Sequence, residues 1–146
     1  MYSKFKHLIL VILFLSVFIS VSYSQTIRIK DQFGDKIAFV DGNVFHDKDK
    51  YGDKLFYFDD LTIREKNQYE DKLFYIHGNT IRTKNQYGDK IYFFDGLTIR
   101  DKNKYGDKLY FIDGQTLRRE NQYGEKIFYI DGIFEKWIIV CLISNK

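Results

Sequence analysis

Apolar and polar positions repeat along most of this chain with a period of 18 residues. Residues 98–115, TIRDKNKYGDKLYFIDGQ, show the unit most clearly, and the copies follow one another without insertion. The copies begin at Thr26, Val44, Thr62, Thr80, Thr98 and Thr116. A fixed internal period is the signature of a repeat architecture in which each copy forms one supersecondary unit. Residues 25–133 are therefore predicted to form one domain of six repeats.

Each repeat contains two short runs suited to β-strands. In the fifth copy they are residues 98–103 and 108–113, and the second run, KLYFID, is rich in the aliphatic and aromatic residues that suit a buried pleated surface. A Tyr-Gly-Asp turn separates the runs, and Asp-Gly joins the second run to the next copy. Asp-Gly between apolar residues is typical of type I′ hairpin turns, in which both central residues take positive φ. Neighbouring strands are therefore predicted to pair antiparallel.

The predicted fold class is all-β, a closed or nearly closed antiparallel meander of about twelve short strands. Closed on itself, such a meander of short strands would form a ring with an apolar hollow or shallow basin, and each of its hairpins is called a petal below. Five or six petals are possible, because the runs that begin at Thr26 and Lys126 either pair to close the ring or lie outside it. The alternative is a β-solenoid, in which each copy forms one coil and the six copies stack in parallel.

Side-chain parity predicts which face of the meander is the interior. Residues paired across a two-residue turn share a face, so Tyr110 and Ile112 group with Leu117. The same face collects Ala38, Val40 and the isoleucine of each Thr-Ile-Arg. Its larger members, predicted to line an apolar, ligand-binding centre, are Phe56, Phe58, Phe74, Ile76, Tyr92, Phe94, Tyr110, Ile112, Phe128 and Ile130. The opposite face is amphipathic, and its arginines must reach water or a carboxylate.

An aromatic residue also recurs once per repeat, in the turn between the two runs. These turn aromatics are Phe33, Tyr51, Tyr69, Tyr87, Tyr105 and Tyr123. A row of tyrosines on one rim would stack on sugars, as in the choline- and glucan-binding repeats of cell-wall proteins. The alternative, which we favour from the sequence, is that each ring caps the end of the core and pairs across its hairpin.

The first 24 residues have the composition of a signal peptide. Lys4 and Lys6 precede an apolar run at residues 8–19, and Ser22 and Ser24 supply small residues for cleavage before Gln25. The alternative is a retained membrane anchor, for which this run is short against the roughly 20 apolar residues of a spanning helix. We therefore expect export to the periplasm, the cell surface or the exterior.

Residues 134–146 end the pattern with an apolar tail. It is predicted to cover the barrel mouth, to fill the interior or to add a last strand. Cys141, the single cysteine of the chain, lies within the tail and is predicted to be an inert, buried hydrophobic residue.

The charge balance gives no reason to expect a nucleic acid partner. Without residues 1–24, the 23 Lys and Arg fall by two, Lys4 and Lys6, to 21 against 20 Asp and Glu. A nucleic-acid-binding domain of this size would show a clear basic excess.

No residues are predicted to be catalytic, to bind a metal or to hold a cofactor. Asp47-x-Asp49 and Asp101-x-Asn103 resemble the opening of a calcium loop, but the bidentate glutamate at the twelfth position is missing. Turns that satisfy their own backbone with Asp and Asn explain the same residues. His46 and His77 occupy non-equivalent positions, and no activated nucleophile accompanies them. The chain is therefore predicted not to be an enzyme.

The repeat TIRxKNxYGDKxYFxDG, preceded by the candidate signal peptide, resembles the β-flower proteins, bacterial exported proteins of the five-fold β-flower type. The resemblance covers residues 25–133 and is carried by the repeat unit. It implies that each hairpin is a petal of a shallow, radially symmetric barrel with an apolar centre. No activity is established for that family, so the resemblance implies no functional residue.

Three hypotheses for the function follow. The first is an exported, non-enzymatic β-repeat module that binds a hydrophobic small molecule, a lipid or a membrane surface through its apolar centre. The second is a structural, curli-like β-solenoid. The third is a glycan-binding surface module that uses the turn tyrosines.

Overall fold

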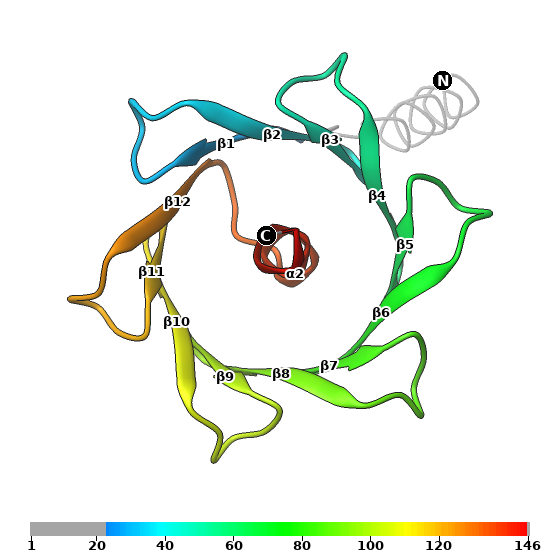
Figure 1. Cartoon of the computed structure of the whole chain (residues 1–146), viewed down its shortest axis with the longest axis vertical. Helices are drawn as coiled ribbons and strands as arrows, with labels where there is room; N and C mark the ends of the chain where they lie inside the picture. Colours follow the sequence, from blue (N-terminus) through cyan, green and yellow to red (C-terminus); the bar gives the residue numbers. More distant parts are fainter. Residues whose placement is uncertain (1–22, 146) are drawn as a thin grey trace, which may run out of the picture.

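A computed structural model describes residues 23–145, which form a closed ring of twelve antiparallel strands around one short helix (Figure 1). The strands are β1 (Ser24–Ile29), β2 (Lys36–Asp41), β3 (Val44–Asp47), β4 (Lys54–Asp59), β5 (Thr62–Glu65), β6 (Lys72–His77), β7 (Thr80–Thr83), β8 (Lys90–Asp95), β9 (Thr98–Asp101), β10 (Lys108–Asp113), β11 (Thr116–Arg119) and β12 (Lys126–Asp131). The helix is α2 (Lys136–Ser144). The predicted closed meander is confirmed.

The ring has six petals. Each petal is one hairpin, from β1–β2 to β11–β12, and its turn points away from the ring axis (Figure 1). The ring is completed by β1 and β12, which pair Thr26 with Asp131 and Ile27 with Ile130. The covalent connection between β10 and β11 has the same register, with Asp113 opposite Thr116. The junction between β12 and β1 therefore has the geometry of a sixth connection between petals, and six petals, not five, is the correct number.

Every strand pairs antiparallel with the strands before and after it, so the β-solenoid alternative is wrong. Parallel coils need a connection that carries the chain back to the same end of the stack. Here a turn follows every run and reverses its direction, so each strand meets its immediate neighbour.

The turns that join the petals differ from the predicted type. Positive φ occurs at Gly114 (+58°) but at neither Asp113 nor Gln115, and Asp113 is the last paired residue of its strand. One positive φ at the first central position is the pattern of type II′, not type I′. Because the turn moves by one residue at both ends, Tyr110, Ile112 and Leu117 still share the interior face.

The turn at each petal tip is held by its own side chains and backbone. In the fifth petal, Asn103 Oδ1 accepts a hydrogen bond from the Tyr105 amide at 2.9 Å, and Arg100 Nη1 donates to the Gly106 carbonyl at 3.1 Å. A Cβ atom placed on Gly106 would lie 1.8 Å from the Asp101 carbonyl oxygen. The close approach of two backbone segments favours glycine here, and five of the six tips carry it; the third tip has Glu70 instead.

Backbone hydrogen bonds also link each petal to the one before it. The Lys102 amide, at a residue with φ of +55°, donates to the Ile91 carbonyl at 3.1 Å. At the junction between the first and last petals, the Lys30 amide donates to the Ile127 carbonyl at 2.9 Å. The junction thus repeats the tip-side contact as well as the strand register, and no petal is left with an unpaired strand edge.

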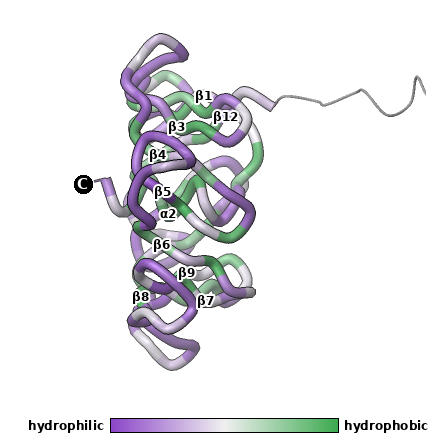
Figure 2. The backbone as a smooth tube through the Cα atoms, turned by 90° about the vertical axis from the view of Figure 1, so that its right-hand side faces the viewer, coloured by the Kyte–Doolittle hydropathy of each residue, from purple (hydrophilic) through white to green (hydrophobic). Residues whose placement is uncertain are grey.

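The apolar tail fills the ring. Residues 137–143 of α2 are all buried, with exposed fractions of 0–5%. A helix that is apolar on every side is stable only when it is surrounded. The twelve strands of the ring surround α2, and Trp137 stacks on Phe58 with ring centroids 5.1 Å apart. Of the three places predicted for the tail, the interior is correct. Seen edge-on, the molecule is a disc whose apolar residues lie mainly inside the ring (Figure 2).

The tip glycines provide a test of this packing. Gly124→Ala is expected to lower the free energy of unfolding by about 1–3 kcal/mol, because the new Cβ would lie 1.7 Å from the Arg119 carbonyl oxygen and the turn must shift. Gln122→Ala, an exposed change in the same turn, should alter it by less than about 0.5 kcal/mol. Urea unfolding measures both. Equal stability of the two variants would contradict the close approach.

Candidate functional site

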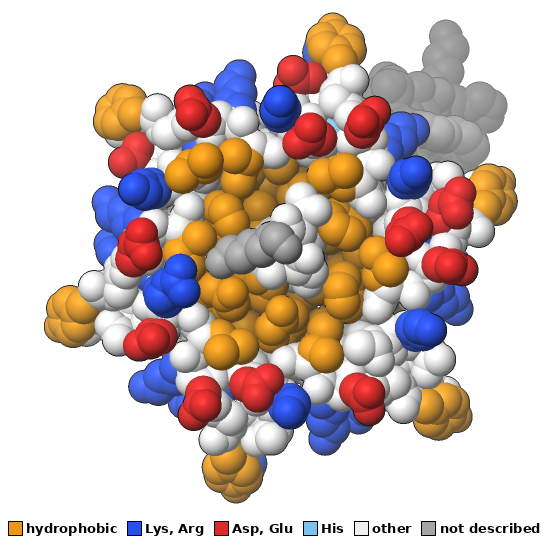
Figure 3. Space-filling model, in the orientation of Figure 1, with side chains coloured by type: hydrophobic (Ala, Val, Ile, Leu, Met, Phe, Trp, Pro, Cys, Tyr) orange, Lys and Arg blue, Asp and Glu red, His pale blue; other side chains and the backbone are white. Residues whose placement is uncertain are grey.

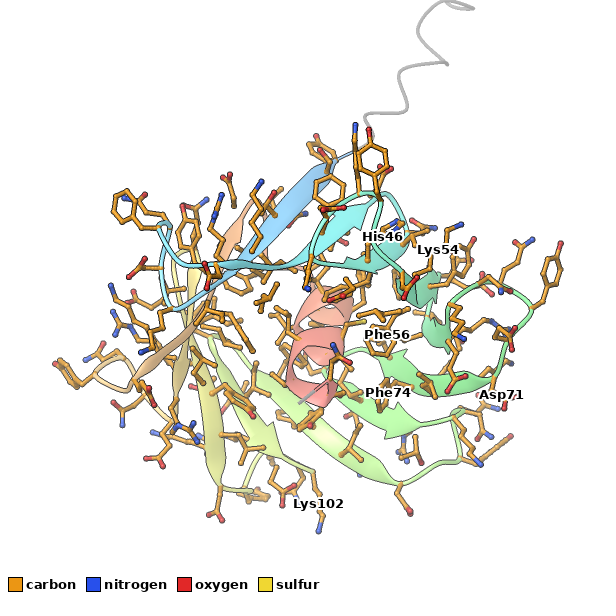
Figure 4. The ribbon with its side chains drawn as sticks, turned by 45° about the horizontal axis from the view of Figure 1, so that its top comes forward. His46, Lys54, Phe56, Asp71, Phe74 and Lys102 are labelled. Atoms are coloured by element: carbon orange, nitrogen blue, oxygen red, sulfur yellow. The ribbon has the colours of Figure 1, made fainter. Side chains whose placement is uncertain are left out.

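The predicted ligand-binding centre is the wall that contacts α2. All ten of its predicted residues lie in the buried core or pack against it. Phe56 and Phe74, for example, point from β4 and β6 toward the helix (Figure 4). The interior face is therefore assigned correctly, but the space that it encloses holds part of the chain itself.

Polar contacts anchor the first turn of the helix to the ring, and a backbone hydrogen bond closes its last turn. Lys136 Nζ donates to the Gly78 carbonyl and to Asn79 Oδ1, each at 2.8 Å. These bonds tie the first turn of the helix to the turn between β6 and β7, one of the Gly-X turns that join neighbouring petals. Trp137 Nε1 donates to Glu135 Oε2 at 2.9 Å. At the other end, the Asn145 amide donates to the Cys141 carbonyl at 3.1 Å. The helix thus begins beside one of these turns, and its other end lies at the face toward the viewer in Figure 1, called the front face below.

Burial raises the pKa of the Cys141 thiol well above its ordinary value. The thiolate is the reactive form of cysteine, so a buried neutral thiol is inert. The predicted burial of Cys141 is confirmed. The group therefore reports whether the helix occupies the ring.

Ile139→Ala in α2 is expected to lower the free energy of unfolding by about 2–5 kcal/mol, because it removes buried methyl groups from the centre of the ring. Leu97→Ala removes the same kind of side chain from a Gly-X turn where the leucine is 57% exposed, and should cost less than about 0.5 kcal/mol. The fluorescence of Trp137, the single tryptophan, follows the unfolding. Equal unfolding midpoints for the two variants would contradict a contribution of the helix to stability.

Cys141 should not react with an aromatic disulfide reagent in the native protein at pH 8, and should react fully in urea. The raised thiol pKa and the lack of access to the reagent act in the same direction. Reaction of the native protein at the rate of a free thiol would show that the tail lies outside the ring.

An aromatic collar surrounds the end of α2 on the front face. The collar consists of one inward residue per petal, namely Ala38, Phe56, Phe74, Tyr92, Tyr110 and Phe128. Apolar side chains encircle the end of the helix, and acidic and basic side chains border them (Figure 3). Burial, followed by the nearby Tyr110, raises the pKa of Tyr92.

The collar is interrupted at Ala38, where the other five petals carry Phe or Tyr. A cavity of about 360 Å³ lies there, against Leu142 and Asn145 of the tail and Phe128 of β12. Its mouth carries Lys36, Lys48 and Asp47. Ala38 was assigned to the interior from the sequence, but the cavity beside it was not foreseen.

The six turn aromatics lie at the petal tips and are the most exposed large apolar residues of the described chain, with exposed fractions of 84–87% (Figure 3). They do not cap the core, so the interpretation that we favoured from the sequence is wrong. The tip turn lies beyond the end of the core, and the hydrogen bond from its amide to the Asp or Asn two residues earlier holds the backbone of the aromatic residue there. The rings lie one per petal around the circumference.

Two of the six rings have a cationic neighbour of their own. Lys50 Nζ lies 4.7 Å from the ring centre of Tyr51, and Lys104 Nζ lies 4.8 Å from that of Tyr105. The other four tips carry glutamine at this position. One face of the rings at Tyr51 and Tyr105 is therefore partly covered by a cation–π contact.

The outward arginines brace the petal tips. Arg118 Nη1 donates to the Gly124 carbonyl at 3.1 Å, and its Nε donates to Asp113 Oδ2 at 2.7 Å. In the second petal His46 takes the arginine position, with its Nδ1 3.1 Å from the Gly52 carbonyl oxygen. The predicted contact of arginines with carboxylates is confirmed for three of them, at Asp59, Asp95 and Asp113. The bond to the turn carbonyl was not foreseen.

The residues that resembled a calcium loop are turn residues. Asp49 Oδ1 accepts from the Tyr51 amide at 2.8 Å, as Asn103 does in the fifth petal, so the backbone interpretation is confirmed. Residues 23–145 contain no group of three or more His, Cys, Asp and Glu placed to hold a metal ion.

No helix among residues 23–145 is long and apolar enough to cross a bilayer. The comparisons with protein-family models, curated proteins and solved structures found no match.

Proposed function

We propose that this chain is an exported, non-enzymatic binding module that attaches to a glycan polymer through its six petal tips. The observation that carries this proposal is an aromatic ring at every tip, exposed by 84–87% in each case. The fold explains the other recurrent tip residues: Asp or Asn caps the turn, and the glycine of five tips permits the close approach, with Glu70 in its place at the third. It gives no structural reason for the ring.

Exposed positions beside the rings differ between copies, so the copies have diverged where nothing constrains them. The residue before the aromatic is glutamine in four copies and lysine in two. The last residue of the first strand of each petal is Ile29, Asp47, Glu65, Thr83, Asp101 or Arg119. An aromatic kept in all six copies against this background supports a binding role.

Ring stacking and avidity suit a polymeric sugar. An aromatic face offers a flat apolar surface to the C–H face of a sugar ring, and the Tyr hydroxyl offers a polar edge. One such contact is weak, but six on a rigid scaffold make later contacts intramolecular. A polymer with repeating units presents many equivalent partners to a ring of equivalent tips.

The apolar centre supports a ligand site less well, because α2 already occupies it. Export is part of the proposal and rests on the composition of residues 1–24, nearly all of which lie outside the described residues. Ser24 is the first residue of β1, and cleavage before Gln25 would leave the closing pairs from Thr26 onward in place. The repeat sequence also supports a proposed membership of the β-flower proteins. Their five-fold type has one petal fewer than this ring.

Removing the rings tests the proposal. The purified protein should co-sediment with at least one insoluble glycan among peptidoglycan, chitin and cellulose. Alanine at Tyr87, Tyr105 and Tyr123 should weaken binding by about 10- to 100-fold through lost avidity, and alanine at all six tips should abolish it. Each exposed substitution should change the free energy of unfolding by less than about 0.5 kcal/mol.

The matched control replaces the six residues before the rings with alanine. These are Gln32, Lys50, Gln68, Gln86, Lys104 and Gln122. Binding should persist in this variant, and should not weaken where Lys50 and Lys104 no longer cover a ring face. Equal binding by the wild-type protein and the six-tip variant would overturn the proposal, as would no binding to any of the three polymers.

A further inference from the structure

We infer that the cavity beside Ala38 is a binding site for a small amphiphile with a carboxylate head group, such as a medium-chain fatty acid. The site is separate from the petal tips and does not depend on their function. Its volume of about 360 Å³ lies within the range of roughly 300–1,000 Å³ that small-molecule sites occupy.

Three departures from the repeat pattern meet in this cavity. Ala38 replaces a collar aromatic and, only 2% exposed, lies at the bottom of the cavity. Ile29, 40% exposed, is apolar where the other copies carry Asp, Glu, Thr or Arg. Phe45 replaces the Ile or Leu of the other copies, packs edge-on against Phe56 at 5.7 Å and forms one wall. These three departures lie together, and there the ring has an apolar hollow.

The apolar part of the site suits a hydrocarbon chain. Leu142 of the helix and Phe128 of β12 line it together with Ala38, so a chain lying there would continue the collar that five aromatic residues form elsewhere. Removing apolar surface from water is favourable by about 25 cal/mol for each Å² buried. The occupant would supply the apolar contacts that a Phe or Tyr side chain supplies in the other petals.

The charges at the mouth favour an anionic head group. Lys36 and Lys48 line the cavity together with a single carboxylate, Asp47, so the local balance is positive. Two ammonium groups beside an apolar hollow match a carboxylate that is attached to a hydrocarbon chain. A cationic amphiphile would be repelled by both lysines.

The site can be tested by calorimetric titration of the purified protein with decanoate. Decanoate should bind the wild-type protein, and Ala38→Phe should abolish binding because it fills the cavity. Phe45 has already taken part of that space, so a second arm of the test is needed in case A38F overpacks the core and fails to fold. The double variant A38F/F45I, which restores the residue types of the other petals, then gives the same answer. Both variants should keep Cys141 protected.

The lysines have a matched control elsewhere in the ring. K36Q/K48Q should weaken decanoate binding by at least about fivefold and leave decanol binding unchanged. K72Q/K84Q, at the equivalent positions of the petals two further along, should bind decanoate like the wild-type protein. No binding of decanoate by the wild-type protein, undiminished binding by a folded A38F or A38F/F45I, or equal loss in the two lysine pairs would overturn the inference. The six-tip variant should bind decanoate normally.

Discussion

The structure depends on filling a ring that is too wide for its own side chains. A barrel of about eight strands is filled by the residues that point into it, and wider barrels enclose space. This ring has twelve strands of only four or six residues, so its wall is apolar and shallow. The helix α2 supplies the missing volume. Trp137 and the residues after it are apolar on all sides, and the wall around them is apolar on one. Each would expose a large apolar surface without the other.

Ring closure follows from the same repeated geometry. The pair between β1 and β12 uses the register of a covalent hairpin, and the Lys30 amide reaches the Ile127 carbonyl as Lys102 reaches Ile91. The backbone of each petal therefore makes the same contacts with its neighbours, including at the junction of the two ends. Because the strands and the backbone bonds between petals hold the ring together, the tip residues stabilise only their own turn. The outward arginines donate hydrogen bonds to a carbonyl of the turn, and the aromatic at the tip faces solvent.

The repeat period and the parity of the strands were sufficient to predict the antiparallel meander and its interior face. Both are local properties, since each strand pairs with the next one along the chain. The number of petals depends on a contact between Thr26 and Asp131, and the sequence showed only that both ends carry the repeat. The turn type was predicted wrongly because Asp and Gly suit either central position, and the pairing of Asp113 decides between them. The place of the tail required the width of the ring, which a period does not contain.

The candidate sites divide in the same way. The positions of the turn aromatics follow from the period, but their distance from the core depends on how far the petal extends. The cavity beside Ala38 had a signal in the sequence, because aligning the six copies with one another shows Ile29, Ala38 and Phe45 as departures from the common pattern. Their meeting at one place became visible only once β1, β2 and β3 were placed beside the end of α2.

The most direct test of the central claim is a nuclear Overhauser spectrum of the protein with labelled isoleucine methyl groups and aromatic rings. A helix inside a closed six-petalled ring predicts cross-peaks between the rings of Trp137 and Phe58, and between Ile27 and Ile130 across the junction. Cross-peaks within the petals but none from Trp137 to the strands, and none between Ile27 and Ile130, would show an open ribbon with its tail outside and would contradict the account.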